Sequence, residues 1–269
     1  MKLLFLFSII LILTSCATKV QYNDPVPIHD TFTLNAPQIG EDRVINVWLP
    51  PNYDSTKDKF PVLYMADGGV VMEDFPHIAN TLAKLIEIDS LPPLILVGIE
   101  NTERRRDLTG FSENMKDSIY CPLSDGAKDF RAFITNELFD EIGEKYRVSD
   151  KRGLIGESLS GLFVMETFFL QPEAFDIYIA MDPSLWWNDN YLVKNTEKLM
   201  SDFPDRPKKL WFAGSDAPDI SKFTNQLEDK LQNMAPKNLK WTYSDEPKEK
   251  HHTIFRATKE KALIWSYGN

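Results

Sequence analysis

The sequence predicts a single α/β domain: a doubly wound, mostly parallel sheet with helices on both faces. Short apolar segments typical of buried strands alternate along the chain with longer segments whose apolar residues recur at helical spacing. Continuous apolar runs indicate strands that are buried on both faces, as in a sheet covered by helices. The chain has 269 residues, 43% of them hydrophobic, which is enough for one substantial core.

The individual elements follow from the same patterns, with Pro50, Pro51 and Asn52 marking a turn after the first strand. Strands are expected at residues 44–49, 60–66, 94–99, 153–156, 178–181, 209–213 and 239–243. Helices are expected at residues 78–88, 127–145, 162–170, 220–234 and 257–267.

The N-terminus has the pattern of an export signal, in which Lys2 precedes an apolar run over residues 3–13 that is too short to span a bilayer. The run ends in Leu-Thr-Ser-Cys, which resembles the bacterial lipobox and assigns Cys16 as the lipidated residue. The alternative is an ordinary signal peptide with a chance cysteine. We expect a signal peptide over residues 1–15, a lipid-anchored tether over 16–30 and the α/β domain over 31–269.

The location of the chain follows from this anchor. Ala17 gives no acidic retention signal after the cysteine, so we expect an envelope protein, anchored to the outer membrane and facing the periplasm. Membrane contact is expected through the lipid alone, because no later run is apolar for long enough to span. The sequence shows no evidence of an obligate protein partner.

Charge and cysteine content restrict the function further. A formal net charge of −10 disfavours binding to nucleic acid. If Cys16 carries lipid, Cys121 remains alone and is expected to serve packing rather than chemistry. The one basic cluster, at residues 104–106, is either a solvated turn or a contact for an anionic substrate, with Arg106 as the expected contact.

The segment Gly-Leu-Ile-Gly-Glu-Ser-Leu-Ser-Gly, residues 153–161, carries the main functional signal. A short strand passes through Ser158 into an apolar helix, which is the setting of a nucleophile elbow. Gly156 and Ser160 occupy the positions two before and two after the serine, where small residues let strand and helix cross closely. A glycine-serine turn without chemistry would give the same short motif.

A serine nucleophile needs a histidine base, and the chain has four histidines. His251 and His252 lie between the last predicted strand and the last predicted helix, where an α/β-hydrolase supplies this base; His251 is preferred. The acid is expected after the preceding strand. Asp216 is the first choice and Asp219 the alternative, although Asp219 would also cap the following helix.

The oxyanion of an acyl-transfer intermediate requires backbone N–H donors. Leu159, directly after the nucleophile, supplies one expected donor, and Gly69, in the Asp-Gly-Gly loop after the strand at 60–66, supplies the other. A plain Asp-Gly turn would have the same sequence.

Several segments together resemble the putative-esterase family of the α/β-hydrolases, which contains enterochelin and bacillibactin esterases and is related to feruloyl esterases. The resemblance extends from about residue 40 to the end. Its pieces are Pro-Val-Leu-Tyr at 61–64 with Asp67 and Gly68, Val-Gly-Ile at 97–99 with Arg-Arg-Asp-Leu-Thr at 105–109, and Asp-Pro-Ser-Leu-Trp-Trp at 182–187. His251 occupies the family's histidine position, whereas Ser160, Gly110 and Asp182 stand where glycine, proline and serine are common.

The resemblance implies carboxylic-ester hydrolysis through an acyl-enzyme, with no metal or cofactor. The substrate would be a siderophore ester or an acylated or feruloylated glycan. Trp186 and Trp187 are expected beside the site, either stacking on a cyclic substrate or packing in the core. Two other functions use the same residues: acyl transfer to an alcohol, and a binding module that kept the fold and lost the chemistry.

Overall fold

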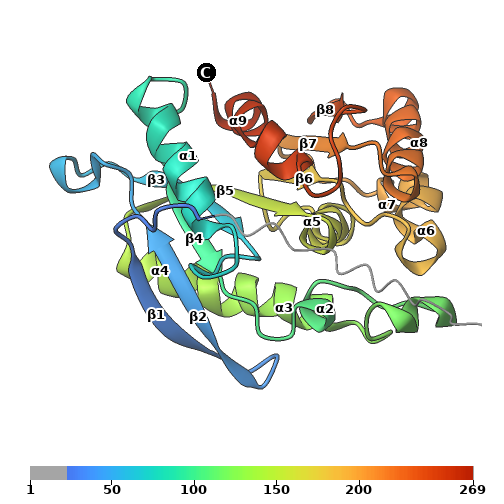
Figure 1. The fold of residues 1–269 in the computed structure, drawn as a ribbon, viewed down its shortest axis with the longest axis horizontal. Coiled ribbons are helices and arrows are strands. Elements are labelled where there is room, and N and C mark those ends of the chain that lie inside the picture. Colours follow the sequence, from blue (N-terminus) through green and yellow to red (C-terminus); the bar gives the residue numbers. More distant parts are fainter. Residues whose placement is uncertain (1–22, 269) are drawn as a thin grey trace, which may run out of the picture.

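An eight-stranded sheet forms the centre of the structure, a computed structural model that describes residues 23–268 (Figure 1). The predicted signal peptide and Cys16 lie outside the described residues. The strand order is β1-β2-β4-β3-β5-β6-β7-β8, in which β1 and β2 pair antiparallel, β2 joins β4 antiparallel, and all later pairs are parallel. The strands are β1 (Asp30–Ala36), β2 (Glu41–Trp48), β3 (Phe60–Met65), β4 (Ile95–Ile99), β5 (Val148–Glu157), β6 (Ile177–Met181), β7 (Lys208–Gly214) and β8 (Leu239–Asp245).

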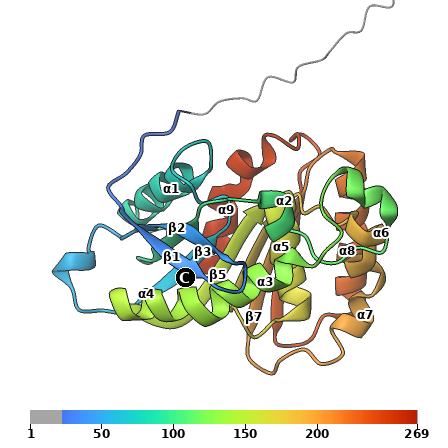
Figure 2. The ribbon, with the colours of Figure 1, turned by 90° about the horizontal axis from the view of Figure 1, so that it is seen from below.

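Helices cover both faces of this sheet (Figure 2). On one face, α1 (Phe75–Glu87) and α9 (Ile254–Tyr267) pack against apolar side chains such as Leu63 and Ile179. The opposite face is covered by α3 (Gly126–Phe133), α4 (Phe139–Lys145), α5 (Leu159–Leu170) and α8 (Pro218–Met234). Shorter helices are α2 (Arg104–Asp107), α6 (Trp187–Lys194) and α7 (Thr196–Leu199), with 3-10 turns at Tyr53–Ser55 and Met115–Ile119.

The predicted fold class is confirmed, and burial explains why the patterns revealed it. All residues of β4 and β6 are buried, which is why both strands have uninterrupted apolar sequences. The apolar segment predicted as one helix over residues 127–145 is continuous, but a π-helical turn at Ile134–Leu138 separates α3 from α4.

The edge strand β1 was absent from the sequence-based expectation. Its residues are mostly exposed or half-buried, and polar residues alternate with Phe32 and Leu34. A strand that packs on one side only leaves a weaker apolar signal than a central strand.

The last residues of the predicted tether contact the domain. Asp24 forms an ion pair with Arg256 of α9 at 2.6 Å, and Asn80 of α1 donates a hydrogen bond to the carbonyl of Pro25 at 2.7 Å. The ring of His29 packs edge-on against Phe75. Ordered contacts with the domain therefore begin before residue 31. None of the helices within residues 23–268 is long and apolar enough to cross a membrane.

Candidate active site

Ser158 stands at the sharp turn between β5 and α5, as the sequence predicts. Its backbone has φ 59° and ψ −117°, a conformation that costs energy for a residue with a Cβ and persists only where the surroundings enforce it. Two hydrogen bonds fix the turn: Ser158 N donates to the carbonyl of Met181 at 3.0 Å, and Ser184 N donates to the carbonyl of Ser158 at 3.1 Å.

The small residues around Ser158 allow β5 and α5 to approach closely. A Cβ at Gly156 would lie 2.5 Å from the backbone carbonyl of Ser160, so any larger residue would displace the helix. Ser160 is buried, and its Oγ donates to the carbonyl of Glu157 and accepts from the Glu157 N–H, both at 2.9 Å. Its hydroxyl thus bridges the turn, a contact that a glycine at this position would lack.

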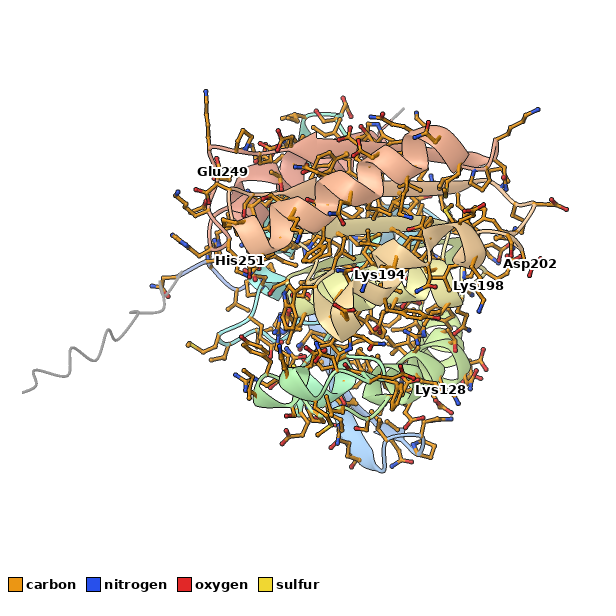
Figure 3. All side chains as sticks on the ribbon, turned by 90° about the vertical axis from the view of Figure 1, so that its right-hand side faces the viewer. Lys128, Lys194, Lys198, Asp202, Glu249 and His251 are labelled. Carbon is orange, nitrogen blue, oxygen red and sulfur yellow. The ribbon has the colours of Figure 1, made fainter. Side chains whose placement is uncertain are left out.

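His251 lies on the loop between β8 and α9, on the same loop as Glu249 (Figure 3). Its Nε2 is 3.1 Å from the Oγ of Ser158, and its Nδ1 is 2.9 Å from the Oδ2 of Asp182. The structure therefore brings together the predicted serine and the preferred histidine. His252, the alternative, is exposed.

The carboxylate that contacts His251 belongs to Asp182, directly after β6. Asp182 is fully buried, with φ 44°, and its two oxygens accept hydrogen bonds from the N–H and the hydroxyl of Ser215, each at 2.5 Å. The hydrogen bond that His251 Nδ1–H donates to Asp182 raises the pKa of the His251 imidazole against the opposing effect of burial. A carboxylate here therefore favours the imidazolium and fixes the ring orientation.

Asp216, the first choice from sequence, does not occupy this place. Its carboxylate forms an ion pair with Lys250, and its N–H donates to the carbonyl of Glu249 at 3.0 Å. The reason is local: β7 ends at Gly214, Ser215 is engaged by Asp182, and the chain then turns Asp216 toward residues 249–250. Asp219, the alternative acid, lines the cleft around Ser158.

The predicted oxyanion donors differ in their surroundings. Leu159 is the first residue of α5, and the N–H groups of the first helical turn have no partner within the helix. The N–H of Gly69 instead donates to the Oε2 of Glu73 at 2.6 Å. Burial raises the pKa of Glu73, although this hydrogen bond opposes the shift. In the structure, the N–H group of Gly69 is therefore already hydrogen-bonded to the Glu73 carboxylate.

The loop carrying Gly69 is held tightly. A Cβ at Gly68 would lie 2.3 Å from the backbone N of Ile99, so only glycine fits there. Asp67, with φ 55°, accepts hydrogen bonds from Asn101 and from both Nε and Nη2 of Arg104. Burial alone would raise the pKa of Asp67, but Arg104 holds it below its usual value.

A cleft of about 310 Å³ opens beside Ser158 and His251. Of the predicted substrate contacts, Trp186 lines this cleft, where its ring packs edge-on against Tyr120 with centroids 5.1 Å apart. Trp187 is instead 3% exposed and donates its indole N–H to the carbonyl of Gly110 at 3.0 Å. Of the two expectations for the tryptophan pair, packing in the core fits Trp187, and a position beside the site fits Trp186.

The basic cluster is also divided. Arg106 pairs with Glu41 at 2.6 Å and with Asp107 at 2.7 Å, which removes it from the cleft. The exposed Arg105 lines the cleft in its place. The cluster therefore contributes a basic residue to the cleft wall, but that residue is Arg105 and not Arg106, the one chosen from the sequence.

Two further groups near Ser158 were not predicted as part of the site. Burial raises the pKa of Glu157, directly before the serine, to about 8. Cys121 is buried, as expected, but also contributes to the cleft wall; burial raises the pKa of its thiol, which keeps it protonated.

The mostly parallel sheet, the strand–serine–helix turn and the histidine loop after the last strand define an α/β-hydrolase fold. The sequence profile of the family described as "Putative esterase" matches residues 36–260, and the chain belongs to this family.

Individual relatives agree with this assignment. The chain is 31% identical over 175 residues to ferri-bacillibactin esterase BesA of Bacillus subtilis (strain 168), spanning 60% of this chain and 61% of the relative. It is 27% identical over 171 residues to the siderophore triacetylfusarinine C esterase of Aspergillus fumigatus, spanning 61% of this chain and 58% of the relative. The alignments thus cover about three fifths of each curated relative.

A solved structure supports the fold. The IroE-like serine hydrolase from Shewanella oneidensis superposes with a TM-score of 0.75 at 24% sequence identity, covering 89% of this chain and 78% of that protein.

Proposed function

We propose that this protein hydrolyses carboxylic esters, with Ser158 as nucleophile, His251 as base and Asp182 as the acid that orients it. The observation that carries the proposal is the continuous chain of hydrogen bonds from Ser158 Oγ through both imidazole nitrogens to a buried carboxylate. Membership of the esterase family supports the same reaction. The proposed acid, Asp182, differs from the sequence-based choice, Asp216, but the chain order serine, acid, histidine is unchanged.

The geometry accounts for each step. Ser158 Oγ attacks the ester carbonyl while His251 Nε2 takes its proton, and the same imidazolium then protonates the departing alcohol. Asp182 accepts from Nδ1, which leaves Nε2 as the basic nitrogen facing the serine. Water, activated by the same histidine, then hydrolyses the acyl-enzyme.

Stabilisation of the oxyanion is the step that requires a change in the structure. Leu159 N–H is positioned at the start of α5, whereas Gly69 N–H must exchange the Glu73 carboxylate for the substrate oxygen. A negatively charged Glu73 beside a developing oxyanion would oppose the reaction, so we expect Glu73 to move away or to be protonated when substrate binds.

We propose a siderophore-type ester with an aromatic or cyclic acyl part as the substrate. The names of the two curated relatives, ferri-bacillibactin esterase and siderophore triacetylfusarinine C esterase, support this class. In the cleft, the rings of Trp186 and Tyr120 offer apolar surfaces and Arg105 offers a positive charge. Such a set suits an aromatic acyl group that carries ionised or hydrogen-bonding oxygens.

The first test is labelling of the purified domain with a fluorophosphonate probe and identification of the modified residue by mass spectrometry. We expect an adduct on Ser158 that Ser158→Ala and His251→Ala both abolish, while Asp216→Ala labels like the wild type. A folded wild-type domain that never labels would instead favour a binding module without chemistry.

The substrate is tested by incubating wild type and Ser158→Ala with a catecholate triester siderophore and with methyl ferulate, followed by chromatography of the products. Preferential cleavage of the triester would support the proposed class, and preferential cleavage of the ferulate would reject it. Adding sugar acceptors to the same reaction separates hydrolysis from acyl transfer, because transfer yields acylated sugar.

We also propose that the chain is exported and anchored through a lipid on Cys16, a residue outside the described structure. The support is the sequence pattern of residues 1–16. Mass spectrometry of the N-terminal peptide from bacterial membranes should show loss of residues 1–15 and a diacylglyceryl group on Cys16. A Cys16→Ser chain should be released from the membrane; recovery of unmodified Met1 in the wild type would refute the proposal.

A further inference from the structure

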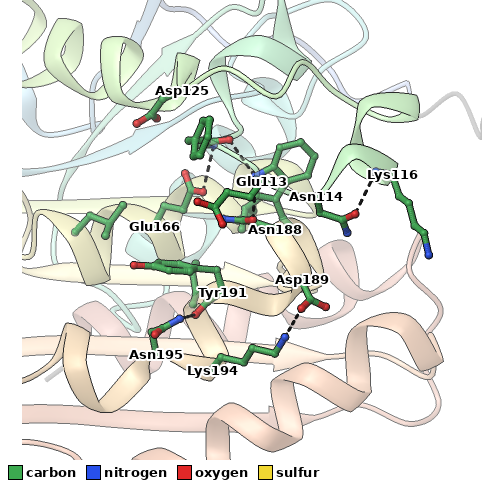
Figure 4. Close-up of a pocket in the computed structure, with 16 residues that line it drawn as sticks. Glu113, Asn114, Lys116, Asp125, Glu166, Asn188, Asp189, Tyr191, Lys194 and Asn195 are labelled. Carbon is green, nitrogen blue, oxygen red and sulfur yellow. Dashed lines mark hydrogen bonds and ion pairs between the residues drawn. The ribbon is translucent and has the colours of Figure 1, made fainter.

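A second cavity, of about 790 Å³, lies apart from the cleft at Ser158 (Figure 4). It is bounded by the segment after Gly110, by α5 and by α6. None of its lining residues is shared with the cleft around Ser158, and the adjacent residues Trp186 and Trp187 line different sites. Figure 3 shows Lys194, at this cavity, away from the loop that carries His251.

Glu166 is the most unusual group in this cavity. It is 5% exposed, and its Oε1 accepts a hydrogen bond from Gly110 N at 3.2 Å. Its Oε2 is buried without a hydrogen-bond partner among the described residues. Figure 4 shows Glu166 among the side chains that line the cavity. A buried carboxylate oxygen with no donor is costly, so the negative charge of Glu166 is poorly compensated beside the cavity.

The nearest buried cation does not supply that partner. Arg131 attracts Glu166 electrostatically, but its guanidinium makes a long hydrogen bond to Thr167 Oγ1 at 3.5 Å and lies over the ring of Phe163. Burial raises the pKa of Glu166 to about 7 despite the opposing charge of Arg131. The surroundings therefore do not fully balance the negative charge of the Glu166 carboxylate.

The rest of the lining favours a positively charged ligand with a hydrocarbon part. Further carboxylates come from Glu113, Asp125 and Asp189, against two lysines, of which Lys194 is already paired with Asp189. Apolar surface is exposed at the mouth, where Phe111 is 57% and Leu170 50% exposed. Two exposed apolar side chains beside a buried acid match an amphipathic cation.

The cavity wall is held in place before any ligand arrives. Three successive residues, Asn188 to Asn190, have left-handed backbone conformations, which residues with a Cβ adopt only under constraint. Asn188 N donates to Asp117 Oδ2 at 2.8 Å, and Asn188 Oδ1 accepts from Glu113 N at 3.0 Å. These bonds join α6 to the opposite wall, so the cavity is formed in the absence of ligand.

We propose that this cavity binds an organic ammonium ion, whose charged group pairs with Glu166 while its hydrocarbon part contacts Phe111 and Leu170. The site is separate from the proposed esterase centre, and its occupancy does not depend on Ser158. The ligand class is a primary amine on an alkyl or arylalkyl body, which supplies a positive charge for the Glu166 carboxyl group and hydrocarbon for the exposed apolar side chains.

The test is isothermal titration of the purified domain with 2-phenylethylammonium and with the uncharged 2-phenylethanol. Wild type should bind the ammonium ion more tightly than the alcohol. Glu166→Gln, which keeps the shape of the side chain and removes its charge, should weaken ammonium binding by roughly 10-fold or more, the usual size of a charged hydrogen bond. Asp202→Asn, an equal charge change at an exposed position on another segment, should leave it unchanged.

Two further variants keep the test decisive if Glu166→Gln folds poorly. Phe111→Ala, at the exposed mouth, should weaken binding of the aromatic amine, and Ser158→Ala should bind it as the wild type does. Equal affinity for the amine and the alcohol, or wild-type affinity in Glu166→Gln, would overturn the proposal. Loss of binding in Ser158→Ala would place the amine at the esterase cleft and overturn it as well.

Discussion

The ends of β6 and β7 lie side by side in the sheet, and each is followed by an aspartate, but the two aspartates have different environments. Asp182 is fully buried and contacts Ser215 and His251, whereas the side chain of Asp216 is 34% exposed and pairs with Lys250. The difference shows that following a strand at the correct edge of the sheet does not place a carboxylate at the imidazole. The direction of the chain over the next two residues decides it.

The largest expected effect separates these two aspartates. Asp182→Asn should lower kcat by about 10⁴-fold, as loss of the orienting carboxylate does in serine hydrolases, because the imidazole loses its preferred tautomer. Asp216→Asn is the matched control and should stay within about 2-fold of wild type, since its partner is an exposed lysine. The rate of hydrolysis of an activated aryl acetate gives kcat for both variants. Equal losses of kcat would show that the two aspartates do not differ in their importance for the reaction.

The next effect comes from the group that holds Asp182. Ser215→Ala removes the hydroxyl that donates to Asp182 Oδ2, and the variant should lose roughly 10-fold in kcat, the lower range for a residue that orients an active-site group. Ser215→Thr keeps the hydroxyl and should restore most of the activity. The midpoint of thermal unfolding, measured for both variants, shows whether the loss arises from the site or from a less stable fold.

The titration of His251 gives a third comparison. The hydrogen bond that the imidazole donates to Asp182 raises the imidazole pKa. The proposed base is the neutral form, so activity should rise as pH increases through a value above that of an ordinary histidine. Asp182→Asn should move this pKa to lower pH, and Asp216→Asn should leave it in place. NMR titration of the His251 ring measures the pKa without relying on residual activity; a wild-type pKa below that of Asp182→Asn would contradict the assignment.

The smallest effect is expected at the exposed ion pair. Lys250→Ala should change the free energy of unfolding by less than about 1 kcal/mol, because the lysine is 60% exposed and water screens the pair. The rate of ester hydrolysis should remain close to wild type. Chemical denaturation measures the stability change, and a loss of several kcal/mol would mean that the loop of His251 depends on this pair.

The sequence was most informative where burial is complete. The central strands and the turn at Ser158 follow directly from apolar runs and from small residues at fixed positions. His251 was found because its loop lies between the last strand and the last helix. The edge strand β1 was missed because its exposed residues carry little apolar pattern.

The aspartate that contacts His251 was missed for a different reason. Asp182 directly follows the predicted strand at residues 178–181, and that strand is the neighbour of β5 in the sheet. This position was a usable signal, but the sequence alone also offered Asp216 and Asp219 after the next strand. The choice depended on where Ser215 and Lys250 direct the chain, and no periodicity encodes those contacts. Arg105 and Arg106 were indistinguishable for the same reason.

The position of Asp182, directly after β6 and in contact with His251, has a consequence for how the cleft can diversify. Ser215 must keep its contact with Asp182, but Ala217 and Asp219 line the cleft without a hydrogen bond to the imidazole. These two positions, at the start of α8, can therefore change in sequence during evolution, or in a directed library, while the nucleophile and its base keep their geometry. They are the natural positions at which to redirect substrate preference in this scaffold.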